Sequence, residues 1–148
     1  MHAGFSAAFA AAVIGFSSCC AAQTPSLVVR VDRRTQELHI SVGTKTGTEE
    51  RYVWRVSTAR TPYATPPGIY RPTWMDPRHF SKEYDHAPMP WAVFYDGGRA
   101  LHGVEAAEVR HLGKPASHGC VRMTAAHAHV FYDLVRRYGM RRTYIVIQ

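Results

Sequence analysis

Short runs of alternating apolar and polar residues recur along this chain, and they favour a mainly β fold. "SLVVRVD" (26–32) and "QELHISV" (36–42) are separated only by "RRT", and the second run alternates Leu38, Ile40 and Val42 with polar residues. A period of two is typical of a strand with one buried face. We therefore predict a half-buried β-hairpin here.

Three later segments also have strand character. "RYVWRVS" (51–57) alternates in the same way, and "TYIVI" (143–147) is a short apolar run typical of a buried strand. "WAVFYDGGRALHG" (91–103) predicts a strand, a tight turn and a second strand, because "DGG" supplies residues that tolerate positive φ. His102 falls at the end of the second of these strands.

Two segments lack a clear period. "TPYATPPGIY" (61–70) is rich in proline, which has no amide for a strand ladder, so we predict a loop that ends in a short extended piece. Residues 71–90 combine aromatic, methionine and charged residues without periodicity. Irregular segments of this length in a small domain are usually lids or binding loops, and we predict that role here.

Two helices are expected. "EAAEVRHLG" (105–113) has an acidic start, a basic end and a terminal glycine, the pattern of a short helix. For the longer helix, Thr124 is the predicted N-cap and Gly139 the predicted stop. Its apolar stripe at helical spacing consists of Val130, Phe131, Leu134, Val135 and Tyr138.

The N-terminal segment differs from the rest of the chain. Residues 3–22, "AGFSAAFAAAVIGFSSCCAA", contain no Asp, Glu, Lys or Arg, and the apolar part is shorter than the roughly 20 residues of a membrane span. We predict a signal peptide over 1–22, one folded domain over 26–148, and export without a transmembrane segment in the mature chain. Two alternatives remain: an irregular N-terminus, and lipid anchoring through Cys19 or Cys20.

Cleavage after residue 22 would leave Cys120 as the only cysteine, so no internal disulfide could form. An unpaired thiol in an exported protein is exposed to oxidation, and nucleophilic chemistry is one reason to keep it. The alternative is an inert cysteine that fills core volume. A zinc site lacks the usual signature, because there is no cysteine pair at ligand spacing, and we predict no metal.

The neighbours of the cysteine, "SHGCVRM" (117–123), favour the nucleophilic reading. A thiol with a pKa of about 8.5 is mostly protonated at neutral pH and needs a base, and His102 and His118 are the candidates. Gly119 allows a close backbone turn, so its amide and that of Cys120 could form an oxyanion hole. This layout suits acyl transfer.

The net charge of +7 lies entirely outside residues 1–22. A basic surface favours anionic surroundings, which outside the cytoplasm means a wall polymer or anionic lipid. The sequence holds no basic helix face, zinc finger or aromatic RNA-binding motif, so we predict no nucleic-acid partner.

These motifs resemble the L,D-transpeptidase catalytic domain, also called the YkuD domain. The family hallmark is a histidine, about fifteen residues and then Ser or Thr, His, Gly, Cys; here fourteen residues separate His102 from "SHGC". "VSTARTPYATPPGIY", "APMPWAVFYDGGRALHG" and "GKPASHGCVRM" are similar to further family segments, so the resemblance covers roughly residues 26–148. Two departures are Ala59, where the family usually has Gly, and Gly103, where some members have Ser.

The resemblance implies a mainly β fold, a β-sandwich of mixed sheets with short flanking helices. It also implies that Cys120 is the nucleophile and that His102 is the base, held by the carbonyl of Gly103. His118 would support the site, while Ser117 and Gly119 would frame the oxyanion hole with Cys120. The implied substrate contacts are Arg122, for a carboxylate, and Tyr84, Met89 and Trp91, although either aromatic could instead be a core residue.

The implied reaction is L,D-transpeptidation without a cofactor. The thiolate attacks the carbonyl before the terminal D-alanine of a peptidoglycan stem tetrapeptide. An amine of a neighbouring stem then resolves the thioester to give a cross-link, or a free D-amino acid resolves it and so exchanges the terminal D-alanine. Resolution by water would make the enzyme an L,D-carboxypeptidase, and a peptidoglycan-binding module without catalysis is the alternative from another class. The resemblance further implies a periplasmic or cell-wall location and inhibition by β-lactams of the carbapenem type.

Overall fold

The computed structural model describes residues 26–44 and 47–148, so the predicted signal peptide lies outside the described residues. Within them, strands form a five-stranded sheet in the order β3-β2-β1-β9-β4 and a four-stranded sheet in the order β5-β6-β7-β8. Both sheets are mixed, which confirms the predicted mainly β fold. The strands are β1 (Leu27–Asp32), β2 (Glu37–Thr44), β3 (Gly47–Arg55), β4 (Gly68–Tyr70), β5 (Trp74–Phe80), β6 (Pro88–Asp96), β7 (Arg99–Val104), β8 (Val121–Thr124) and β9 (Thr143–Ile147).

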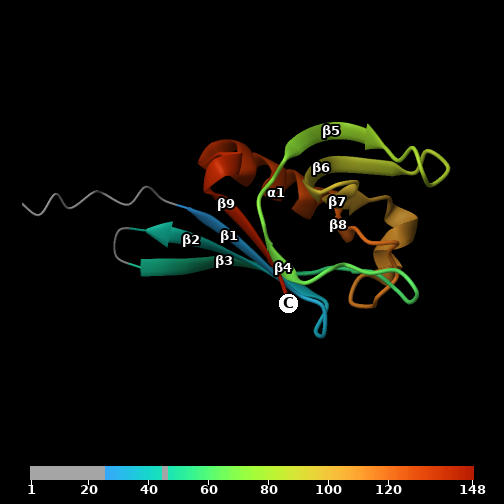
Figure 1. The fold of residues 1–148 in the computed structure, drawn as a ribbon, viewed down its shortest axis with the longest axis horizontal. Coiled ribbons are helices and arrows are strands. Elements are labelled where there is room, and N and C mark those ends of the chain that lie inside the picture. Colours follow the sequence, from blue (N-terminus) through green and yellow to red (C-terminus); the bar gives the residue numbers. More distant parts are fainter. Residues whose placement is uncertain (1–25, 45–46) are drawn as a thin grey trace, which may run out of the picture.

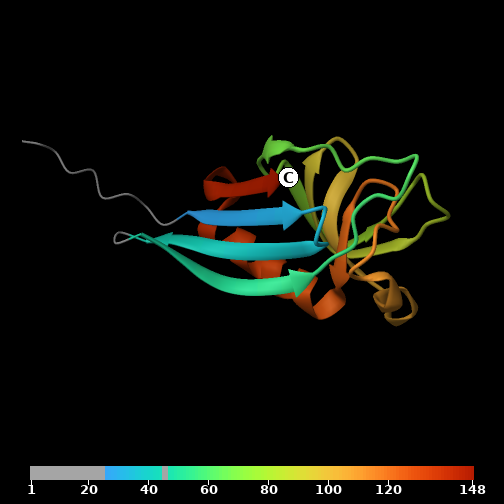
Figure 2. The ribbon, with the colours of Figure 1, turned by 90° about the horizontal axis from the view of Figure 1, so that it is seen from below.

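The first sheet is built on the predicted hairpin. β1 and β2 pair antiparallel, and the Asp32 carboxylate accepts hydrogen bonds from the amides of Arg34 and Thr35, which shapes the turn between them. β9 pairs in parallel with β1, so the last strand lies beside the first (Figure 2). The third strand, predicted over 51–57, begins earlier, at Gly47, and ends at Arg55.

The second sheet corrects the prediction for residues 71–90, which was wrong in treating the whole segment as irregular. β5 lies within it and pairs antiparallel with β6. The pairing of β5 with β6 is interrupted at Pro77 and at Trp91, which lies opposite it and has a φ of +58°. Next to Pro77, the Asp76 carboxylate accepts a hydrogen bond from the Arg78 amide. β5 is also an edge strand in which no residue is buried, so no simple alternation of apolar and polar residues is visible in the sequence.

The helix α1 (Ala125–Tyr138) packs on β6, β7 and β8 and also contacts β1, so it completes a core shared by both sheets (Figure 1). Thr124 caps it by accepting a hydrogen bond from the His127 amide, and Gly139 ends it with a φ of +85°, as predicted. The predicted short helix is a 3₁₀ helix, η1 (Ala106–His111), and a second, η2 (Met140–Arg142), precedes β9. Fully buried core side chains include Val29, Leu38, Leu101, Met123, Phe131 and Val135.

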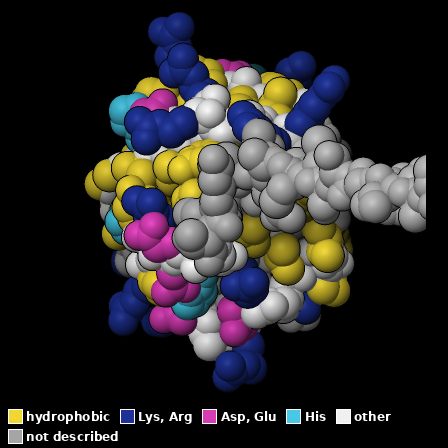
Figure 3. Space-filling view, turned by 90° about the vertical axis from the view of Figure 1, so that its left-hand side faces the viewer, with side chains coloured by type: hydrophobic (Ala, Val, Ile, Leu, Met, Phe, Trp, Pro, Cys, Tyr) yellow, Lys and Arg dark blue, Asp and Glu magenta, His cyan; other side chains and the backbone are white. Residues whose placement is uncertain are grey.

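On the face shown in Figure 3, lysine and arginine side chains are spread around the rim, with acidic side chains between some of them. This distribution agrees with the scattered basic residues of the sequence. Within residues 26–44 and 47–148, no helix has the length and apolar character needed to cross a membrane.

Candidate active site

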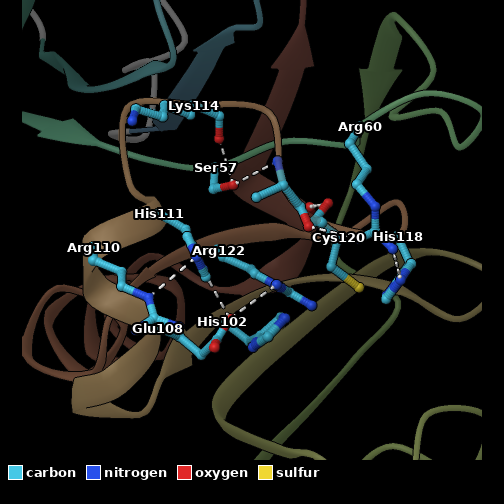
Figure 4. A network of polar contacts seen from close by, with 12 residues as sticks. Ser57, Arg60, His102, Glu108, Arg110, His111, Lys114, His118, Cys120 and Arg122 are labelled. Carbon is cyan, nitrogen blue, oxygen red and sulfur yellow. Dashed lines mark hydrogen bonds and ion pairs between the residues drawn. The ribbon is translucent and has the colours of Figure 1, made fainter.

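Parallel pairing of β7 with β8 brings the two hallmark segments together. His102 on β7 is the register partner of Arg122 on β8, and Cys120 immediately precedes β8. The side chains of all three line one cavity of about 790 Å³, together with His118 (Figure 4). The structure therefore gathers residues that lie up to twenty positions apart in the sequence.

The loop that carries the cysteine is fixed by the segment that follows β3. The Ser57 hydroxyl donates to the Lys114 carbonyl at 2.7 Å and accepts from the Ala116 amide at 3.1 Å. The Thr58 carbonyl accepts from the amides of Ala116 and Ser117, both at 2.9 Å. These bonds hold the loop against the segment that follows β3, as Figure 4 shows for Ser57.

Two buried polar residues that the sequence reasoning did not single out complete this support. The Gln36 side chain donates to the Thr58 hydroxyl and accepts from the Thr58 amide, each at 2.8 Å. The Thr65 hydroxyl accepts from the Ala59 amide at 3.0 Å and donates to the Gly119 carbonyl at 2.9 Å. The only sequence signal for Thr65 was its place in a segment that resembles the family. Nothing in the sequence marks Gln36 as a residue of the site.

Ser117 shapes the backbone around the cysteine. Its hydroxyl is fully buried, donates to the Cys120 carbonyl at 2.6 Å and accepts from the Gly119 amide at 3.1 Å. Because the Gly119 amide is engaged there, the Cys120 amide is the better candidate oxyanion donor of the two that the sequence suggested. Gly119 has a φ of +139°, and a β-carbon there would lie 3.3 Å from the Ala64 carbonyl oxygen, so the turn requires glycine.

His102 is buried and held in one orientation. Its Nδ1 lies 2.7 Å from the Gly103 carbonyl, so Nδ1 carries the proton and Nε2 is left as the acceptor. Burial lowers its pKa to about 4, despite the opposing effect of the Gly103 carbonyl. A β-carbon at Gly103 would lie 2.8 Å from the α-carbon of Ala125, which explains why this chain has no serine there.

The thiol of Cys120 rests in its neutral form. Burial raises its pKa, although the Ala100 amide, which donates to the sulfur at 3.4 Å, and the nearby Arg122 and Arg99 act in the opposite direction. No hydrogen bond joins this sulfur to His102, and its other contact is the Gly98 carbonyl at 3.9 Å. The resting pair is thus a thiol and a neutral imidazole, not a thiolate and an imidazolium.

His118 is held by contacts of its own. The Arg60 guanidinium donates to its Nε2 at 2.7 Å, Tyr63 meets the ring edge-on, and Tyr84 stacks on it with 4.5 Å between ring centres. Burial, followed by the charge of Arg60, lowers the pKa of His118. With Nε2 occupied by Arg60, this imidazole is suited to hold the cavity wall and not to deprotonate the thiol.

The candidate substrate contacts divide into two groups. Arg122, Tyr84 and Met89 line the cavity, and Arg122 also forms an ion pair with Glu108 at 3.6 Å. Trp91 does not line it: its ring stacks on His129 of α1, so it is a packing residue. The described residues contain no cluster of three or more His, Cys, Asp or Glu side chains suited to a metal ion.

Solved structures share this architecture. An L,D-transpeptidase from Mycobacterium smegmatis matches with a TM-score of 0.71 and 19% identity over 84% of this chain and 59% of that chain. One from Stackebrandtia nassauensis matches with a TM-score of 0.69 and 22% identity over 90% and 61%. L,D-transpeptidase 3 from Mycobacterium tuberculosis, in complex with a faropenem-derived adduct, matches with a TM-score of 0.69 and 17% identity over 84% and 60%.

The fold is therefore that of the L,D-transpeptidase class. The sequence model of the YkuD family, described as the L,D-transpeptidase catalytic domain, matches residues 23–147, and the chain belongs to this family. It spans about three fifths of the length of the solved chains described above. A search of curated proteins finds no significant match.

Proposed function

We propose that this protein is an exported cysteine L,D-transpeptidase that acts on peptidoglycan stem peptides. The observation that carries the proposal is the shared cavity of Cys120 and His102, in which the Gly103 carbonyl fixes the imidazole with Nε2 free to accept a proton. Family membership supports the same reaction.

In the first half-reaction, the Cys120 sulfur attacks the carbonyl carbon that precedes the terminal D-alanine. His102 Nε2 takes the thiol proton as the carbon–sulfur bond forms, because the resting thiol is neutral. The Cys120 amide donates to the developing oxyanion, and Arg122 holds a substrate carboxylate. Collapse of the tetrahedral intermediate breaks the carbon–nitrogen bond, and D-alanine leaves with the proton from His102.

The second half-reaction resolves the thioester. An amine of a neighbouring stem peptide forms the new amide and gives a cross-link, whereas water gives a tripeptide product. We propose transfer to an amine as the main reaction and hydrolysis as the alternative. The L,D-transpeptidase 3 structure described above contains a faropenem-derived adduct, and we propose that carbapenem-type β-lactams likewise acylate Cys120.

Export is part of the proposal. Its support is the uncharged apolar stretch within residues 3–22 and the net charge of +7 carried by the remainder. The expected location is the periplasm or cell wall, either free after cleavage of the signal peptide or anchored by lipid at Cys19 or Cys20. The mass of the N-terminal peptide from the native protein distinguishes these forms.

The test is incubation of the purified protein with a disaccharide tetrapeptide, with products and intact protein mass followed together. Loss of D-alanine with a cross-linked dimer is the expected result, and the Cys120→Ala variant should form neither product nor adduct. The His39→Gln variant, altered on β2 outside the cavity, serves as the active control. Binding of the fragment without release of D-alanine would instead support a binding module.

A further inference from the structure

A second histidine with its own carboxylate partner faces the same cavity. His79, at the end of β5, lines the cavity, and its Nδ1 lies 3.3 Å from a carboxylate oxygen of Asp76. The His79 side chain is 18% exposed, so it is open to the cavity but mostly enclosed. This pair belongs to neither hallmark segment, and the mechanism above does not use it.

Aromatic side chains fix the orientation of the His79 ring. Trp74 and Phe94 stack with 3.9 Å between ring centres, and His79 meets both edge-on, at 5.3 Å and 4.9 Å. With Nδ1 donating to Asp76, the neutral imidazole presents Nε2 as an acceptor. Three side chains therefore constrain a base that faces substrate space.

His79 is also coupled to the catalytic pair. A positive charge on His79 would disfavour a positive charge on His102, because the two interact electrostatically across the cavity. The charged or titratable residues of the neighbouring strands that line this cavity are Arg99 and His102 of β7 and Arg122 of β8. Two histidines on strands separated by β6, His79 on the edge strand β5 and His102 on β7, thus line one cavity.

The choice of acyl acceptor sets how many protons must be removed. An alkyl amine with a pKa of about 10.4 is an ammonium at neutral pH and must lose two protons to become an amide nitrogen. One proton returns to the Cys120 sulfur through His102 as the carbon–sulfur bond breaks. The second proton of the ammonium must leave the site. When water is the acceptor, only one proton is transferred, and it goes to the sulfur.

We propose that His79, oriented by Asp76, is a catalytic base for the amine acceptor. The acceptor nitrogen forms its bond to the thioester carbonyl carbon, His79 Nε2 takes the proton that does not return to sulfur, and this proton passes to solvent at the cavity edge. The products are the amide, the Cys120 thiol and one released proton. This inference rests on the proposed transpeptidase function and identifies a group that favours amine transfer over hydrolysis.

The experiment measures how the thioester partitions in the purified protein. The wild type and the His79→Gln variant receive the disaccharide tetrapeptide with either of two probes, glycinamide, which is largely protonated at low pH, or hydroxylamine, which is unprotonated at neutral pH. A positioned base contributes about 10²- to 10⁴-fold, and solvent can replace part of this. We expect the ratio of glycinamide adduct to tripeptide to fall at least about tenfold at pH 7, where glycinamide is still mostly protonated and hydroxylamine is mostly unprotonated, while the hydroxylamine ratio changes less than about threefold.

Controls separate this role from a structural one. Asp76→Asn should reproduce the selective loss in a smaller degree with the aromatic contacts kept, and His39→Gln should leave both ratios unchanged. Equal losses with both probes, or no loss with either, would overturn the role of His79, as would a wild type that only hydrolyses. If the wild type releases no D-alanine and forms no adduct on Cys120, the proposed function itself fails.

Discussion

Replacing Ser117 by alanine tests whether its hydroxyl holds the nucleophile loop in place. The hydroxyl is fully buried and makes two hydrogen bonds, to the Cys120 carbonyl and from the Gly119 amide. Each buried group left without its partner costs about 1–3 kcal/mol. With two such groups, we expect the free energy of unfolding to fall by about 2–6 kcal/mol, against a typical domain stability of roughly 5–15 kcal/mol.

The same change should slow acylation. Without Ser117 the turn at Gly119 loses the bond that sets the direction of the Cys120 backbone, and a misplacement of about 1 Å can cost on the order of 100-fold in rate. Urea unfolding measures the stability, and intact mass after mixing with a carbapenem measures acylation of Cys120. Ser41→Ala, a buried serine on β2, is the matched control. A loss below about 0.5 kcal/mol together with an unchanged acylation rate would refute the reasoning.

Three further outcomes are expected. Gly103→Ser should lower the free energy of unfolding by about 1–3 kcal/mol or prevent folding, because its β-carbon would lie 2.8 Å from Ala125; an undiminished urea midpoint would contradict this. The pKa of His102 falls from 6.5 to about 4 on folding, so its stabilising effect is present above pH 6.5 and is lost toward pH 4. Between pH 7 and pH 5 the free energy of unfolding of the wild type should fall by about 2 kcal/mol more than that of His102→Gln. Urea unfolding at both pH values measures this difference. Since burial raises the pKa of Cys120, iodoacetamide should alkylate it more slowly than a free thiol at pH 7, and faster alkylation would show that the thiolate is already formed.

The last expectation could not be drawn from the sequence. The sequence predicts only that Cys120 needs a base, whereas the structure encloses Cys120 and places no protonated imidazole beside it. Sequence spacing brings the histidine and the cysteine into one site but gives no measure of how much water reaches them. Desolvation is a property of the packed cavity and is decided by residues far apart in the chain.

Strand prediction succeeded where one face of a strand is buried and failed where neither face is. β1 and β2 alternate cleanly because one side of the first sheet packs on the core. β5 was missed because it is an edge strand in which no residue is buried, so burial imposes no alternation on its sequence. Of the two readings that the sequence left open for Trp91, the structure favours the core residue, because its ring packs on α1, whereas Met89, two positions earlier, lines the cavity.

The support of the nucleophile loop was beyond sequence reasoning for a related reason. Most of its bonds use backbone groups, such as the Thr58 carbonyl that accepts from two amides of the loop. Any residue type can supply such groups, so of the residues that support the loop only Ser57 and Thr65, which lie in a family-like segment, leave a trace in the sequence. Ala59 fits this picture, because its amide is bound by Thr65 and its side chain is not required.

The low pKa of His102 has opposite effects on the two steps that it would serve. Burial makes the imidazole a weak base, so it can take the thiol proton only as the sulfur bonds to carbon, and an unbound Cys120 stays a protected thiol. The same burial makes the imidazolium, with a pKa of about 4, a strong acid toward the leaving nitrogen of D-alanine. Expulsion of an amine needs that acid more than attack by a thiol needs a strong base. A cavity that desolvates both groups therefore favours acyl transfer from an amide over reaction of the free thiol.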